Sequence, residues 1–202
     1  MTALPDGWVE MPLEDVTTVV LGQSPPGSSY NVERLGTPFL QGKAEFGDIT
    51  PEIRKWTTAP KKMAREGDVL LSVRAPVGPT NLAPCTLSIG RGLAALRAED
   101  GLSNRYLLWA MRATATRLAD KATGTTFPAV SGKVVRSHMI PVPPLPEQQR
   151  IVASIEEQFS RLDAAEASLA LAVVRSRSLR QSVLREAFAG RLLGDAGKEF
   201  IG

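Results

Sequence analysis

Two patterns of hydrophobic and polar positions divide the chain near residue 144. Before that point, Gly and Pro recur every few residues and separate short apolar runs rich in β-branched side chains. Short runs of this kind, bounded by turn-forming residues, are typical of strands. We therefore expect strands, or parts of strands, at residues 17–22, 37–42, 67–74 and 92–97.

A helical pattern follows these predicted strands. From Ser103 to residue 122, apolar side chains recur three or four positions apart, and Ser103 is a suitable N-cap. Ser131 can cap a shorter helical turn, and "HMIPVP" (138–143) predicts a last edge strand that prolines end. Residues 1–143 are therefore expected to form an α/β domain with many irregular connections.

After the stiff stretch "PVPPLP" (141–146), the pattern becomes helical without a break. Neither Pro nor Gly occurs again until Gly190, and Pro146 suits the first helical position. A helix of this length spans about 66 Å at ~1.5 Å per residue. Its apolar stripe is close to a heptad repeat, is interrupted near Ser176 and Arg180, and consists of Ile151, Ile155, Phe159, Leu162, Leu169, Val173 and Val183, with Leu184 beside it.

The stripe needs a partner helix, because a domain of this size cannot cover it. A helix lying on a membrane surface is the alternative, but the polar face mixes both signs of charge instead of being rich in lysine. We therefore expect residues 144–193 to form a dimerisation helix in a coiled coil, and residues 194–202 to form a flexible tail.

Composition narrows the class of protein. With 43% hydrophobic and 22% charged residues among 202, the chain resembles an ordinary soluble protein. It has no apolar run of the roughly 18 residues that span a membrane, and its N-terminus does not resemble a signal peptide. The single cysteine, Cys85, excludes a disulfide framework and a zinc-cysteine cluster. We expect a cytoplasmic protein.

The charge of the chain is mildly basic but clustered. The formal net charge is +3, and "RKWTTAPKKMAR" (54–65) holds five basic residues and no acidic one. A local basic patch attracts polyanions even when the whole chain is nearly neutral. A solvated loop face explains this patch equally well when it is taken alone.

Candidate catalytic groups do not form a recognisable set. His138 is the only histidine, which excludes a histidine metal cluster, and no glycine-rich cofactor loop follows a predicted strand. The stretch "ATGTTFPAVSGK" (122–133) ends in Gly-Lys but is not a phosphate-binding P-loop. Phe127 stands where the first Gly should be, and Val134 replaces the metal-binding hydroxyl. We expect a binding protein without catalytic residues, metal or cofactor.

Seven stretches in register resemble the specificity subunit of type I restriction-modification systems. They cover roughly residues 4–193, and the element Ile-Pro-x-Pro-Pro-x-x-Glu-Gln-x-x-Ile is the most diagnostic. The stretches are "LPDGWVEMPLEDV", "GQSPPGSSYN", "GTPFLQGK", "GDVLLSVRAPVG", "ATGTTFPAVSGKVV", "IPVPPLPEQQRIVASIEEQFSRLDA" and "LREAFAGRLL".

The resemblance implies a fold and a set of partners. Residues 1–143 would be a target-recognition domain for double-stranded DNA, and 144–193 a spacer helix that packs antiparallel. Family members carry two copies of each, whereas this chain carries one, so it is either a half-subunit that forms a homodimer or a fragment of a longer protein. The implied protein partners are methyltransferase subunits, which carry the cofactor, and a motor nuclease subunit that can join them.

The resemblance also gives the polar loops a role at DNA. For base reading we select Arg74, Gln23 and Gln41, since Arg pairs with guanine and Gln with adenine in the major groove. Hydroxyl and basic side chains contact phosphate and set the register of the protein on DNA. The further predicted DNA-contacting residues are Ser24, Lys43, Arg54, Lys55, Lys61, Lys62, Arg91, Thr123, Thr125, Thr126 and Lys133.

Two other classes of function compete with DNA reading. One is a coiled-coil assembly protein whose globular part binds protein, with the basic patch merely solvated. The other is a hydrolase that uses Cys85 or His138, although nothing in the sequence brings the two together.

Overall fold

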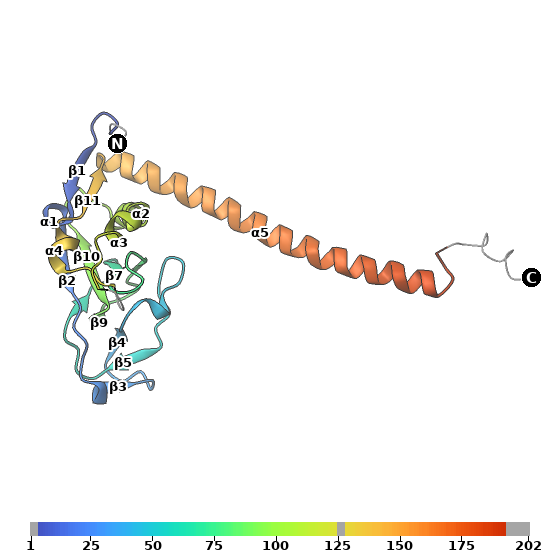
Figure 1. Cartoon of the computed structure of the whole chain (residues 1–202), viewed down its shortest axis with the longest axis horizontal. Coiled ribbons are helices and arrows are strands. Elements are labelled where there is room, and N and C mark those ends of the chain that lie inside the picture. Colours follow the sequence, from blue (N-terminus) through green and yellow to red (C-terminus); the bar gives the residue numbers. More distant parts are fainter. Residues whose placement is uncertain (1–3, 125–127, 193–202) are drawn as a thin grey trace, which may run out of the picture. The chain divides into compact units, whose positions relative to one another are not determined.

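The computed structural model describes residues 4–124 and 128–192 (Figure 1). The chain divides into two compact units, Met1–Val152 and Ala153–Gly202. The boundary between the units lies inside the last helix, α5 (Leu145–Phe188), whose first turns belong to the globular unit. The predicted domain boundary at residues 143 and 144 stays a prediction.

Three sheets form the globular unit, as Figure 1 shows. A two-stranded antiparallel sheet joins β1 and β11 near the chain's N-terminus. A four-stranded antiparallel sheet has the order β2-β10-β7-β8, and a five-stranded sheet has the order β3-β5-β4-β9-β6, in which β4 and β9 run parallel. The strands are β1 Val9–Pro12, β2 Thr17–Leu21, β3 Tyr30–Asn31, β4 Thr37–Leu40, β5 Lys55–Thr57, β6 Met63–Ala64, β7 Val69–Ser72, β8 Thr80–Leu82, β9 Leu87–Ile89, β10 Leu93–Ala98 and β11 Met139–Val142.

All four strands expected from the apolar runs are present, as β2, β4, β7 and β10. The predicted edge strand before the prolines is confirmed as β11. The strands that the sequence pattern missed have at most four residues, which is too short for an alternating pattern to be recognised.

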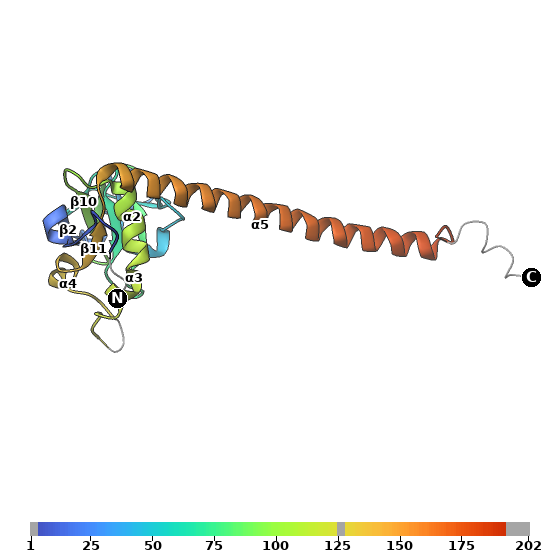
Figure 2. The ribbon, with the colours of Figure 1, turned by 90° about the horizontal axis from the view of Figure 1, so that it is seen from above.

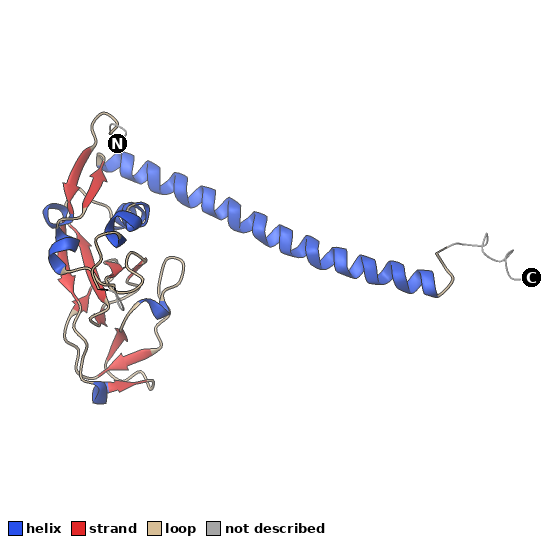
Figure 3. Ribbon diagram, in the orientation of Figure 1, coloured by secondary structure: helices blue, strands red, loops and turns tan. Residues whose placement is uncertain are grey.

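Short helices connect and cover the sheets (Figure 3). Before the long α5, they are α1 Leu13–Val16, η1 Gly27–Ser29, η2 Lys43–Glu45, α2 Asn104–Ala113, α3 Ala115–Ala119 and α4 Gly132–Arg136. The two predicted serine caps are confirmed. Ser103 Oγ accepts a hydrogen bond from Tyr106 N, and Ser131 Oγ accepts one from Val134 N.

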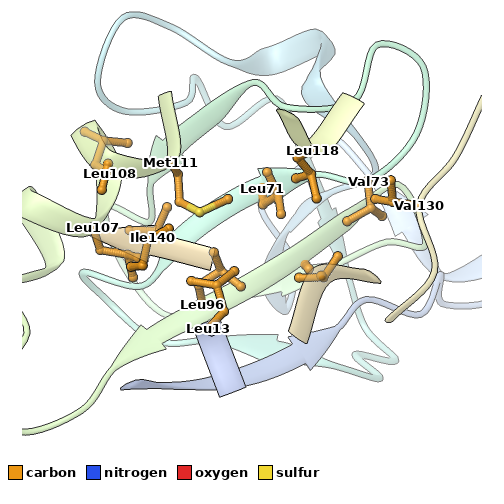
Figure 4. Close-up of a cluster of buried hydrophobic side chains, with 14 of the residues drawn as sticks. Leu13, Leu71, Val73, Leu96, Leu107, Leu108, Met111, Leu118, Val130 and Ile140 are labelled. Carbon is orange, nitrogen blue, oxygen red and sulfur yellow. The ribbon is translucent and has the colours of Figure 1, made fainter. Parts of the chain in front are cut away.

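The four-stranded sheet is buried on both faces, because successive side chains of a strand point to opposite sides. In β7, Val69 and Leu71 join a core cluster with α2, while Leu70 joins a second cluster with Leu40 and Ile89 of the five-stranded sheet. Figure 4 shows the first cluster, where Leu107, Leu108 and Met111 of α2 meet Leu71, Leu96 and Ile140. This double burial explains why β7 reads as an uninterrupted apolar run.

The single helix predicted for residues 103–122 is wrong in one respect, because the structure has two helices that part at Thr114. α2, which packs across β7, β8 and β10, is followed directly by α3 in Figure 2. At Thr114 the side-chain hydroxyl donates to the carbonyl of Ala110 at 2.9 Å and meets His138 Nε2 at 2.8 Å. These contacts, made by a side chain whose backbone has left helical angles (φ −105°, ψ 6°), divide the predicted helix.

His138 is a structural residue of the core, 1% exposed. Because the Thr114 hydroxyl donates to the Ala110 carbonyl, its oxygen is available to accept a hydrogen bond from His138 Nε2–H. Burial, reinforced by the positive charges of Arg117 and Lys121 and opposed by Glu10, lowers the pKa of His138 to about 4.

We expect this depressed pKa to make stability depend on pH. An unfolded histidine has a pKa of about 6.5, so the unfolded chain binds more protons between pH 6.5 and 4. The stabilisation is therefore complete above pH 6.5 and is lost as the pH falls towards 4, by on the order of 2–3 kcal/mol. Urea unfolding at pH 7, 6, 5 and 4 measures it, with His138→Gln as the comparison. An identical slope in the variant would contradict the assignment to His138.

The first turn of α5 is held by Gln148, which is fully buried. Its Oε1 accepts from Ser103 N at 2.8 Å, and its Nε2 donates to the carbonyls of Gly101 (2.8 Å) and Pro143 (2.9 Å). Ile151 and Val152 continue this contact by packing against the first core cluster.

Both ends of α5 lie close to their predicted positions. The helix begins at Leu145, one residue before Pro146, and ends at Phe188. Gly190 follows in a left-handed conformation (φ 72°), which favours glycine and suits the predicted helix stop. Over residues 4–124 and 128–192, no helix has the length and apolar character required to cross a membrane.

Candidate nucleic-acid interface

Three segments of the globular unit cross at a point that we call the glycine crossing, made by Gly22, Gly90, Gly92 and the backbone of Gln41. Gly22 N donates to the Leu93 carbonyl at 2.9 Å, and Gly90 N donates to the Leu40 carbonyl at 2.8 Å. The crossing therefore ties the end of β2, the end of β4 and the β9–β10 turn together, although they are far apart in sequence.

Glycine is required here by lack of space. A Cβ atom on Gly22 would lie 2.1 Å from the Gly90 carbonyl oxygen, and one on Gly90 would lie 2.9 Å from Gln41 Cα. On Gly92 it would lie 2.7 Å from the Gln41 carbonyl oxygen. These neighbours are backbone atoms, which cannot rotate away as the end of a side chain can.

The residues beside these glycines carry exposed polar side chains. Gln23 follows Gly22, Gln41 precedes Gly42, and Arg91 stands between Gly90 and Gly92; all three side chains are exposed. Ser24 belongs to the same group, since its Oγ accepts from Arg91 N at 3.3 Å. The structure thus brings together four of the residues predicted from sequence.

Arg74 joins this group across a hollow of about 230 Å³. Val73 and Arg74 line one part of the hollow, Arg91 lines it from the β9–β10 turn, and Leu93 lines it from the start of β10. Within the part of the chain that the structure describes, neither Arg74 nor Arg91 makes an ion pair or a side-chain hydrogen bond. Among the described residues neither guanidinium group has a carboxylate partner, so both are available to bind an anion or the acceptor edge of a base.

The segment with the candidate threonines adjoins the hollow. Ala129 forms isolated antiparallel bridges with Arg74 and with Thr123, and Val130 N donates to the Val73 carbonyl at 3.0 Å. Thr123 is exposed, whereas Thr125 and Thr126 lie outside the described residues. Lys133 is exposed on α4 and follows Gly132, which lines the hollow.

The remaining predicted cations are exposed and lie on several different elements around the glycine crossing. The carbonyl of Lys62 accepts from Ile89 N at 2.8 Å, which places Lys62 and its neighbour Lys61 beside the end of β9. Lys43 opens η2, two residues after Gln41. Lys55 is on β5, opposite Phe39 of β4.

Arg54 differs from the other cations because it is already paired. Its Nη2 lies 2.6 Å from Glu52 Oε2, and this hydrogen-bonded carboxylate raises the pKa of Arg54. Both side chains are largely exposed, so the pair is weak and can exchange partners. Its charge is nevertheless partly compensated, unlike that of Arg74.

The sequence reading missed the glycines of the crossing and the anchoring role of Gln148. A signal for the first existed in "LGQ", where Gly22 ends a predicted apolar run and precedes a polar residue, and in "IGRG", where two glycines flank Arg91 at the start of another predicted run. A signal for Gln148 is hard to find, because a glutamine in a helix reads as a surface residue.

Other chemistry has little support in the geometry. Among the described residues, no three His, Cys, Asp or Glu side chains are grouped to hold a metal ion. Burial raises the pKa of the Cys85 thiol, which makes it a poorer nucleophile. His138 is committed to Thr114.

Comparison with known proteins gives a consistent result. A family model described as the type I restriction modification DNA specificity domain matches residues 5–169. The putative type I restriction enzyme MjaX specificity subunit of Methanocaldococcus jannaschii is 41% identical over 156 residues, which are 76% of this chain and 37% of that protein. The type I restriction enzyme EcoDI specificity subunit of Escherichia coli is 36% identical over 85 residues, 42% of this chain and 19% of that protein.

A solved structure shares the fold. The HsdS subunit from Thermoanaerobacter tengcongensis aligns with a TM-score of 0.79 and 43% identity, over 95% of this chain and 47% of that subunit. The chain thus spans less than half the length of each of these relatives.

Proposed function

The chain belongs to the family of type I restriction modification DNA specificity domains, and from this premise we propose that it reads DNA sequence for a methyltransferase complex. The observation that carries the proposal is the glycine crossing, which presents Gln23 and Gln41 beside Arg74. These are the side-chain types that recognise adenine and guanine edges.

The interface divides into two groups of residues. Arg74, Gln23 and Gln41 read bases. Phosphates are held by the exposed cations and hydroxyls around them, namely Ser24, Lys43, Arg54, Lys55, Lys61, Lys62, Arg91, Thr123, Thr125, Thr126 and Lys133. The chain itself is not an enzyme in this proposal, and the methyl transfer and ATP hydrolysis belong to methyltransferase and motor nuclease subunits that it binds.

The two groups should respond differently to mutation. Arg74→Ala should cost about 1–3 kcal/mol on the preferred sequence and relax one base position. Lys61→Ala should weaken binding to all sequences alike. Binding to a sequence selected from a random library, and to its scrambled form, measures both variants. Equal losses on the two DNAs for Arg74→Ala would remove it from the reading group.

The salt dependence of binding tests the proposal as a whole. A DNA reader releases counterions from phosphate, so its affinity falls steeply as salt rises. The long apolar stripe of α5 is also compatible with the competing hypothesis, a coiled-coil assembly protein. Such a protein should bind DNA weakly, and its DNA affinity should change little with salt concentration. Titration of duplex DNA between 50 and 200 mM salt separates the two hypotheses. A reader that makes six phosphate contacts should lose on the order of 10³-fold in affinity over this range.

Antiparallel pairing of two α5 helices would make this chain a homodimer that reads a bipartite palindromic site. The charges of α5 support that direction. Residues 145–171 hold five acidic and two basic side chains, whereas residues 172–188 hold four basic side chains and one acidic. An antiparallel pair sets the acidic half of each helix against the basic half of the other, and two-fold symmetry then repeats the DNA-reading surface. Light scattering on the purified chain, with an expected mass of twice 21.7 kDa, tests the dimer.

A further inference from the structure

The loop that carries Arg74, residues 73–79, contains a short exposed arch between two anchored ends. Residues 74–76, which we call the arch, are exposed, whereas Val73 and Val77 on either side are buried in the first core cluster. Val73 N also donates to the Gly92 carbonyl at 3.0 Å. Both ends of the arch are therefore fixed to the globular unit.

A buried hydroxyl group ties the arch to the end of β7. Ser72, the last residue of β7, is 2% exposed. Its Oγ donates to the carbonyl oxygens of Arg74 (3.0 Å) and Pro76 (2.9 Å), which share its single proton. Its backbone binds the same loop, because Ser72 N donates to the Pro79 carbonyl and Gly78 N donates to the Ser72 carbonyl. All the polar groups of Ser72 thus bind residues of this loop.

Packing within the strand does not explain a serine at this position. The three preceding residues of β7, Val69, Leu70 and Leu71, are apolar and fully buried. Burying a hydroxyl costs free energy unless the group is hydrogen-bonded. The Ser72 hydroxyl offsets this cost through the two carbonyls of the arch. Its contribution is therefore to the arch, whereas an apolar side chain would suit the strand itself.

Fixing the Arg74 carbonyl restricts the directions that the Arg74 side chain can take. A peptide unit is planar, so a hydrogen bond to its oxygen orients the whole unit and the Cα atom that belongs to it. On its other edge, Arg74 forms an antiparallel bridge with Ala129. A guanidinium group pairs with a base edge through two parallel hydrogen bonds, which require one plane and one direction. Side chains with such a task depend on supporting hydrogen bonds that hold them in place.

We infer that Ser72 is a positioning residue for sequence reading, whose hydroxyl holds the arch so that Arg74 is directed at a base edge. This inference rests on the reading role of Arg74 in the proposed function. Ser72 itself is buried and acts on DNA only through Arg74.

The discrimination ratio tests this role. We define it as the affinity for a duplex selected from a random library divided by the affinity for its scrambled form. Ser72→Ala should lower this ratio about 3- to 10-fold, the effect of roughly one net hydrogen bond, while the affinity for the scrambled duplex should stay within about two-fold. Partial unfolding cannot produce this result, because an inactive fraction lowers both affinities by the same factor.

Two further serine variants complete the series. Ser72→Cys replaces the hydroxyl by a thiol, a weaker donor, and should give a ratio between those of the parent and Ser72→Ala. Because it leaves no cavity, it provides the test if Ser72→Ala does not fold. The matched control is Ser88→Ala. Ser88 on β9 is fully buried, and its Oγ has no hydrogen-bond partner within residues 4–124 and 128–192. Its ratio should remain within about two-fold of the parent, and equal losses for Ser88→Ala and Ser72→Ala would overturn the inference.

A double-mutant cycle with Arg74→Ala shows whether Ser72 acts through Arg74. Without the guanidinium group there is nothing to direct, so adding Ser72→Ala should not lower the ratio of Arg74→Ala further. The same fold loss in both backgrounds would overturn the inference, because Ser72 would then act independently of Arg74. Equal weakening on both duplexes by Ser72→Ala, with the ratio retained, would reduce Ser72 to a purely structural residue and would overturn it as well.

The outcomes separate this inference from the proposed function. If Arg74→Ala lowers the ratio and Ser72→Ala does not, the positioning role is wrong while reading by Arg74 stands. If Arg74→Ala leaves the ratio unchanged, the reading role of Arg74 is wrong and the inference fails with it. DNA binding as such is reported independently by the salt slope.

Discussion

Gly22→Ala should lower the free energy of unfolding of the globular unit more than the addition of a methyl group at an ordinary strand position does. The added Cβ would lie 2.1 Å from the Gly90 carbonyl oxygen and 2.7 Å from the Leu93 carbonyl oxygen, so the backbone at the crossing has to separate. We expect a loss of at least about 3 kcal/mol, near the upper end for single substitutions. Thermal unfolding should show a decrease in Tm of about 6–12 °C.

Gly42→Ala is the matched control, because it lies in the same region and has nothing within 4 Å of its added Cβ. Its φ of −162° is extended backbone that any residue adopts. We expect this variant to melt within about 2 °C of the parent protein, consistent with an effect of under 0.5 kcal/mol. Equal losses for the two variants would show that the crossing tolerates a side chain.

Gln148→Ala should have the second-largest effect on stability. It leaves Ser103 N and the carbonyls of Gly101 and Pro143 without their buried partner. Each unsatisfied group costs on the order of 1 kcal/mol or more, so we expect a loss of about 3 kcal/mol in the free energy of unfolding.

Its neighbour provides the comparison. Gln149 is exposed on the same helical turn, so Gln149→Ala should change stability by less than about 0.5 kcal/mol. Urea unfolding of both variants, followed by tryptophan fluorescence, measures the difference. If the two glutamines behave alike, the buried hydrogen bonds of Gln148 do not hold the start of α5.

Local patterns in the sequence were enough to predict the elements that depend on local rules. The apolar runs identified β2, β4, β7 and β10, and the unbroken helical pattern identified α5. Ser103 and Ser131 were recognisable as caps because capping involves residues only three positions apart.

Features that depend on distant residues were not predictable in this way. The break at Thr114 involves His138, and Gln148 is buried by groups that include Gly101, 47 positions earlier. Gln23, Gln41, Arg74 and Arg91 could be selected for their chemistry, but only the tertiary structure shows that the glycine crossing groups them.

The glycine crossing has a consequence for how such a protein can evolve. Its shape is maintained by residues that have no side chain, while Gln23 and Gln41, which stand next to them, are exposed and contribute little to the core. Exchange of one exposed polar side chain for another leaves the backbone in place. Under selection for new DNA targets, a single point mutation of an exposed polar residue can therefore change the recognised sequence while the backbone and the stability of the fold are retained.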